Sequence, residues 1–141
     1  MAATVDNRPT SSKPQASDVG KEYILSQTVA FTTTANQLAQ NETMALFDIP
    51  ANTMVSAAWI KVTTADTDIT DVDLGVSTDG STNATLIDGA TLATTGYKTN
   101  GTYLPIAVTA ANQVVLTNKD ADTINGAVIT VVIVCRSLAL T

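Results

Sequence analysis

The sequence predicts an all-β fold, a jelly-roll-like antiparallel β-sandwich, and three observations support it. Short runs rich in Thr, Val and Ile recur along the chain, and these residues favour a pleated strand over a helix. Asp-Gly and Asn-Gly dipeptides separate several of the runs and accept the positive φ of tight turns. The sequence contains no heptads and no helical periodicity. An immunoglobulin-like sandwich is the nearest alternative, although its Cys…Trp…Cys signature is missing.

The chain divides into two regions near residue 21. Residues 1–21 are rich in Ser, Thr, Pro and Asn and have few large apolar side chains, so they cannot bury enough surface to fold alone. We therefore expect an extended N-terminal arm at 1–21 that lies on a neighbouring subunit or a larger assembly. Packing of the arm on its own body, or a crystal contact, is the alternative. Residues 22–141 form the predicted sandwich domain.

Within this domain the strands are predicted at 22–33, 42–49, 53–64, 70–77, 102–109, 112–118 and 125–138, with a weaker one at 91–97. The corner Pro50-Ala51-Asn52 separates the second strand from the third, because proline has no amide hydrogen for a ladder and asparagine tolerates turn conformations. In the third strand both faces are apolar. One face carries Met54, Ala58, Ile60 and Val62, and the other carries Val55, Ala57 and Trp59.

The remaining elements follow from local pattern. In 70–77, alternation predicts a buried face of Thr70, Val72, Leu74 and Val76 and a wet face of Asp71, Asp73 and Gly75. Pro105 predicts an edge strand or a bulge at 102–109. The last strand is apolar on both faces and suits a central position. The segment Ser81–Ala90 is the one place where a short helical turn is expected.

Composition excludes several function classes. The chain has 141 residues, no histidine and one cysteine, so histidine triads, most transition-metal sites and an intrachain disulfide are excluded. Cys135 lies in an apolar run and is expected to be a buried, inert thiol. Residues 22–141 hold eleven acidic and four basic side chains, which argues against binding to nucleic acid or an anionic membrane. We find no signal peptide and no apolar run long enough to span a membrane.

A dense group of carboxylates, Asp66, Asp68, Asp71 and Asp73, is the one candidate for chemistry. Its spacing does not match an EF-hand loop, and the chain has few aromatic residues for a sugar-binding cleft. We interpret the group as a polar loop that runs into a strand, with calcium binding as the alternative. No catalytic, cofactor or metal site is predicted.

Trp59 has two interpretations. Its face of the strand is either buried within the monomer or is a contact with a partner, since aromatic residues anchor interfaces. The expected interface residues are Arg8, Pro9, Lys13 and Pro14 in the arm and Val55 and Trp59 in the strand.

Several segments together resemble the small β-sandwich virion proteins of tailed bacteriophages, especially capsid decoration (cement) proteins. The segments are DIPANT at 48–53, WIKVTTA at 59–65, DLGVSTDG at 73–80, LIDGATL at 86–92 and VVLT at 114–117. The resemblance implies a non-enzymatic protein that binds the major capsid protein on the outer capsid surface, often as a trimer at local threefold positions. Because no targeting segment is visible, we expect synthesis in the host cytoplasm. A tail, fibre or spike component that binds a host surface is the first alternative. A carbohydrate-binding module is the second, disfavoured by the few aromatic residues.

Overall fold

The computed structural model describes residues 4–8, 22–77, 84–99 and 104–138, and its regular structure is almost entirely β. The strands are β1 (Val5–Asp6), β2 (Glu22–Ala30), β3 (Thr43–Ile49), β4 (Thr53–Thr64), β5 (Val72–Ser77), β6 (Ile87–Ala90), β7 (Gly96–Lys98), β8 (Ile106–Val108), β9 (Asn112–Asn118) and β10 (Val128–Ser137). The one helix in the described part of the chain is a 3₁₀ turn, η2 (Thr34–Asn36), and no helix there could cross a membrane.

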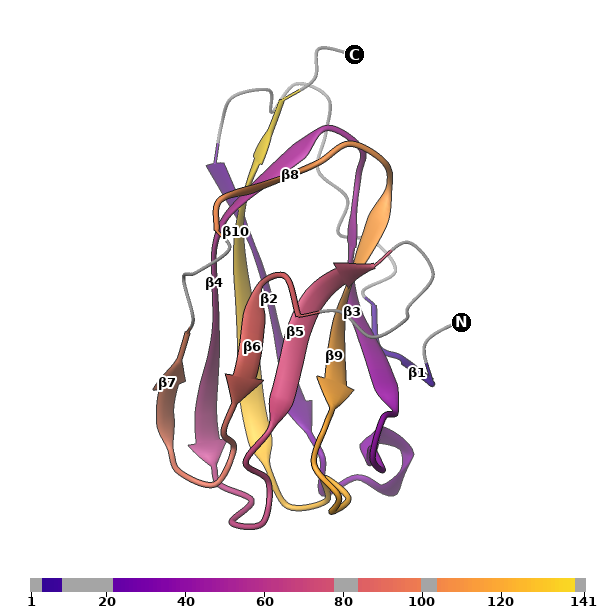
Figure 1. Ribbon diagram of the computed structural model, residues 1–141, viewed down its shortest axis with the longest axis vertical. Helices are drawn as coiled ribbons and strands as arrows, with labels where there is room; N and C mark the ends of the chain where they lie inside the picture. The colour runs from indigo at the N-terminus through magenta and orange to yellow at the C-terminus, as the bar shows by residue number, and fades with distance from the viewer. Residues whose placement is uncertain (1–3, 9–21, 78–83, 100–103, 139–141) are drawn as a thin grey trace.

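Two sheets pack face to face, as Figure 1 shows, with β5, β6 and β9 lying over β2, β4 and β10. Sheet A has the order β1-β3-β9-β5-β6, and sheet B has the order β2-β10-β4-β7, with β8 also paired to β4. All the pairings are antiparallel except that of β1 with β3, which is parallel. The predicted jelly-roll-like sandwich is therefore confirmed. β10 lies between β2 and β4, which confirms the central position inferred from its two apolar faces.

The core fills the space between the sheets with large apolar side chains from both of them. Phe31, Phe47, Ile60 and Leu74 are at most 2% exposed, and each such side chain contributes about 1.5–3 kcal/mol by leaving water. Cys135 is also buried there, as the sequence predicts. Burial raises the pKa of its thiol to about 12, so the thiol is un-ionised and unreactive at neutral pH.

The Pro50–Asn52 corner carries the chain from β3 in sheet A to β4 in sheet B, at the top of Figure 1. Asn52 has a φ of 57°, in the left-handed region that asparagine tolerates better than most residues. The Thr53 hydroxyl donates to the Pro50 carbonyl at 2.9 Å, and the Leu138 amide donates to the Asn52 carbonyl at 2.7 Å. These bonds fix the corner against the end of β10.

The predicted faces of β4 are wrong at one end of the strand. Val55 is fully buried in the core, and Met54 points the other way, because the register of β4 against β10 shifts between Val55 and Ala57. This β-bulge inserts Ser56, so the side that faces the core changes from odd to even residue numbers. Ala58, Ile60 and Val62 lie in the core as predicted. Trp59 therefore lies on the outer face without Val55.

The predicted wet face of 70–77 is exposed at Asp71 but wrong at Asp73 and Gly75. Val72 and Leu74 are buried as expected, but Asp73 is only 6% exposed and Gly75 is buried too. β5 lies between β9 and β6. The Asp73 carboxylate accepts a hydrogen bond from the Gly89 amide at 3.0 Å. Burial, with Asp88 and Asp71 nearby, raises the pKa of Asp73.

Two further expectations are corrected. The described part of Ser81–Ala90 contains no helical turn but the strand β6, whose Gly89 has a φ of 74°. The weak strand at 91–97 appears as the short β7, shifted toward its C-terminal end. Pro105 directly precedes β8, a three-residue strand on the edge of β4, as the proline predicts. Two of the Asp-Gly and Asn-Gly dipeptides that predict tight turns, Asp79-Gly80 and Asn100-Gly101, lie outside the described part of the chain.

Candidate interaction surfaces

The outer face of sheet B, on the side away from the core, is the first candidate surface. On β10 the odd-numbered residues from Ile129 to Cys135 are buried, so the even-numbered residues point outward. The strand register then places twelve side chains in four rows across β2, β10 and β4: Glu22–Arg136–Met54, Ile24–Val134–Ala57, Ser26–Val132–Trp59 and Thr28–Thr130–Lys61. We call these twelve residues the outer face.

The middle of the outer face is apolar. Val132 and Trp59 lie directly opposite each other on adjacent strands, and the next row holds Ile24, which is 64% exposed. Beside Trp59 lies a hollow of about 460 Å³, lined mainly by β4 and by Tyr97, which is 68% exposed. A solvated sheet face normally carries polar side chains, so this apolar strip is a candidate contact surface.

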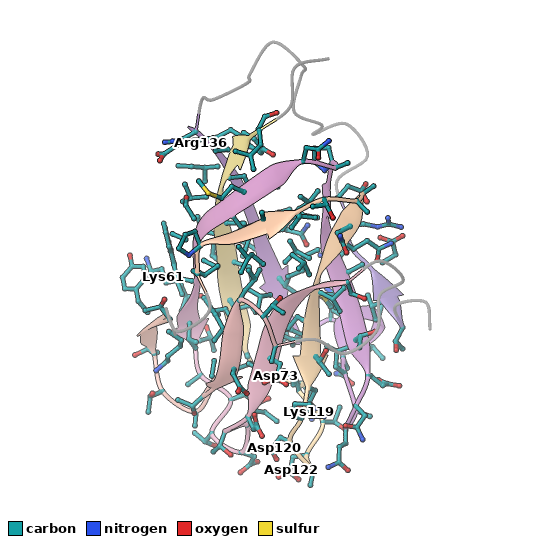
Figure 2. The ribbon with its side chains drawn as sticks, turned by 45° about the horizontal axis from the view of Figure 1, so that its top comes forward. Lys61, Asp73, Lys119, Asp120, Asp122 and Arg136 are labelled. Carbon is teal, nitrogen blue, oxygen red and sulfur yellow. The ribbon has the colours of Figure 1, made fainter. Side chains whose placement is uncertain are left out.

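The charges of the outer face are few and mostly cationic. The Lys61 ammonium lies 5.6 Å from the centre of the Tyr97 ring, within cation–π range, and Arg136 pairs with Glu22 at 3.1 Å. The outer face thus has no unpaired carboxylate, although the chain as a whole carries a net charge of −6. Figure 2 shows Asp120 and Asp122 at the end of the molecule opposite Arg136.

The second candidate surface is the place on β3 that holds the N-terminal segment, residues 4–8. Val5 and Asp6 pair in parallel with Met44 and Ala45, and the Asn7 amide donates to the Ala45 carbonyl at 2.9 Å. The backbone amides of Thr4 and Thr43 each donate to the other residue's hydroxyl at 3.3 Å. The segment therefore adds a strand to the edge of sheet A. We call the β3 residues and Gln27 that contact it the N-terminal seat.

Polar side chains fix the segment at its C-terminal end. The Gln27 amide nitrogen donates to the carbonyls of Asn7 and Leu46 at 2.6 and 3.0 Å, which ties β2 to β3. Its oxygen accepts from the Asn7 side chain. The Arg8 guanidinium pairs with Asp48 at 2.8 Å and with Asp6 at 2.6 Å. Its hydrogen bonds lower the pKa of Asp6 to about 2.

The expected interface residues lie in different parts of the structure. Arg8 lies on the N-terminal seat of its own body, the alternative that the sequence left open for the arm. Trp59 lies on the outer face, and Val55 lies in the core. Pro9, Lys13 and Pro14 are outside the described residues.

Sequence reasoning did not single out Ile24, Val132 and Val134 as surface residues. The feature of the sequence that could have revealed Val132 and Val134 is the apolar character of both faces of the last strand. A central position in the sheet explains only part of that character. A central strand has paired edges on both sides, but its outer face can still be open.

The carboxylate group near Asp66 does not converge on a metal. Among residues 4–8, 22–77, 84–99 and 104–138, no three His, Cys, Asp or Glu side chains are placed to hold a metal ion. Asp66 is 8% exposed, and its carboxylate accepts hydrogen bonds from the amides of Asn125 and Gly126 at 3.0 and 2.9 Å. Asp68 and Asp71 are exposed. The Asp66 carboxylate thus joins the β4–β5 loop to the loop before β10.

Three chains of solved structures share this fold. A chain in the capsid of Ralstonia phage GP4 aligns with a TM-score of 0.65 at 14% identity, over 89% of this chain and 90% of that chain. A chain in the acidic stable capsid structure of Helicobacter pylori bacteriophage KHP30 gives 0.62 at 18% identity, over 84% and 89%. A chain in the cyanophage Pam1 capsid asymmetric unit gives 0.62 at 16% identity, over 89% and 91%.

No protein-family model and no curated protein matches the chain. At such identities the three structural matches establish a shared fold. The aligned region spans about nine-tenths of each matched chain, so those chains are themselves little larger than one such sandwich.

Proposed function

We propose that this protein is a non-enzymatic structural component of a phage virion, specifically a decoration protein that binds the major capsid protein on the outer surface of the shell. The observation that carries the proposal is the likeness, over nearly the whole of both chains, to chains of three phage capsids. The described residues also offer no histidine, no reactive thiol and no metal-binding cluster for catalysis.

The outer face would supply part of the contact surface that this role needs. Three strands about 4.8 Å apart and four rows about 6.8 Å apart cover roughly 400 Å². A stable pairwise complex needs about 800 Å² on each partner. The outer face alone would therefore bind weakly, which suits a protein that is held by a repeating shell and by further contacts among its own copies. A trimer at a local threefold position would supply such contacts.

Binding to purified shells that lack the protein tests the proposal. Wild-type protein should co-sediment with the shells, and Trp59→Ala should lose this binding while its circular dichroism and melting temperature stay close to wild type. Asp122→Ala, at an exposed position in the loop between β9 and β10, is the control and should bind normally. Cryo-electron microscopy of the virion then locates the protein. Density confined to the tail would refute the decoration role and favour the alternative, a tail, fibre or spike component.

A further inference from the structure

The N-terminal seat recognises its segment by contacts that do not depend on which copy of the chain supplies the segment. The parallel ladder, the Gln27 bonds and the Arg8–Asp48 pair all join residues 4–8 to β2 and β3. A segment from another copy could form the same bonds at the same seat. Cis and trans occupancy therefore differ mainly in the entropy of the connection.

The length of the connection permits both arrangements. Residues 9–21 join the segment to β2, and extended chain of this length reaches about 40 Å. The bonded pair Asn7 and Gln27 lies only five residues along β2 from Glu22, about 17 Å of strand. A body of this size has a radius of gyration of about 14 Å, so the seat of an adjacent copy is also within reach.

The segment is also weakly enough held to exchange. Its ladder has two residues, and the Asp6 and Asp48 side chains are 56% and 39% exposed. Exposed ion pairs of this kind contribute about 0–1 kcal/mol each. Release of the segment leaves the rest of the sandwich intact, because β3 keeps its pairing with β9. Local opening of such an edge needs far less free energy than global unfolding.

We infer that residues 4–8 exchange between neighbouring copies, the seat of each copy holding the N-terminal segment of the next. The contact is head-to-tail, so it closes into a ring when the copies are related by rotation. High local concentration favours the trans arrangement, and dilution favours the cis arrangement. The inference concerns contacts between copies of this chain and stands whether or not the shell is the partner.

Cysteine cross-linking between two separately made variants tests the exchange. Asp6 and Ala45 are register partners, and adjacent strands bring their Cα atoms within the range that a disulfide spans. One variant carries Asp6→Cys, and the other carries Ala45→Cys with an affinity tag that changes its mass. When the two are mixed and mildly oxidised, a disulfide between positions 6 and 45 can form only in trans. We expect this heterodimer, identified by peptide mapping, at a yield that rises with protein concentration.

Two controls make the outcome decisive. A mixture of Asp6→Cys with Thr123→Cys, an exposed position, measures collisional cross-linking and should give several-fold less heterodimer. Wild-type protein should give none, because Cys135 is buried. The double variant, with both cysteines in one chain, reports whether the seat is occupied. Heterodimer no greater than the collisional control, with the double variant closing only within monomers, would overturn the inference. A double variant that forms no disulfide would overturn it as well.

Discussion

Substitution of Asp66 tests whether this carboxylate supports the structure. Asp66→Ala removes the acceptor of two backbone amides, those of Asn125 and Gly126. A buried amide without a partner costs about 1–3 kcal/mol. Asn125 is exposed and Gly126 half-buried, so water relieves part of this penalty. We therefore expect a loss of about 2–4 kcal/mol in the free energy of unfolding.

Thermal denaturation followed by circular dichroism measures this loss. At about 3 °C per kcal/mol for a chain of this size, the melting temperature should fall by roughly 6–12 °C. Asp66→Asn keeps an oxygen that can accept and should lose about half as much. The matched control is Asp68→Ala, an exposed carboxylate of the same loop, whose effect should stay within about 0.5 kcal/mol. If Asp66→Ala melts no lower than Asp68→Ala, the Asp66 carboxylate does not hold the two loops together.

Further tests concern Cys135, Asp73, Asn52 and the binding of Ca²⁺. Thiol reagents at pH 8 should modify Cys135 only as fast as the chain unfolds, because the thiol is buried and burial raises its pKa to about 12. Rapid labelling of the native protein would contradict its burial. The raised pKa of Asp73 means that stability falls as pH rises from about 4 through the folded-state pKa, so Asp73→Asn should flatten the pH dependence of urea denaturation. Asn52→Ala should lower the free energy of unfolding by about 1 kcal/mol and Asn52→Gly by much less, because the φ of 57° strains alanine. Equal denaturation midpoints for the two variants would argue against a left-handed conformation at residue 52. Millimolar Ca²⁺ should leave the melting temperature unchanged. A rise would support calcium binding by the carboxylate group near Asp66.

The sequence predicted the strands well because the signals that mark them lie within each strand or at its ends. β-branched runs and the Pro50 corner mark the elements, and an apolar run on both faces marks the central β10. These signals need no knowledge of distant neighbours. They predicted the sandwich class and most strand positions between residues 22 and 137.

The errors concern features that only pairing decides. The bulge at Ser56 exists because β4 must match the register of β10, so alternation counted along β4 alone placed Val55 beside Trp59. Asp73 is buried, and its carboxylate accepts from the Gly89 amide of β6, a contact that no pattern within β5 reveals. In the N-terminal seat, Arg8 bonds to Asp48, which lies forty positions away in the sequence. Sequence reasoning therefore identified Trp59 and the N-terminal arm as candidate contacts. It missed Val132 and Val134 of the outer face and the N-terminal seat.

The antiparallel pairing of β2 with β10 has a mechanical consequence. The first residue of β2 and the last residues of β10 meet at one end of the body, where Glu22 pairs with Arg136. A pulling force applied between these two strand ends would open the ladder one bonded pair at a time, as a zipper does, because the strands run in opposite directions. A force along the strand axis, applied at opposite ends of β2 and β10, would instead load all the bonded pairs of the ladder together. Under tension the ladder should therefore resist best when the two strands are pulled from opposite ends.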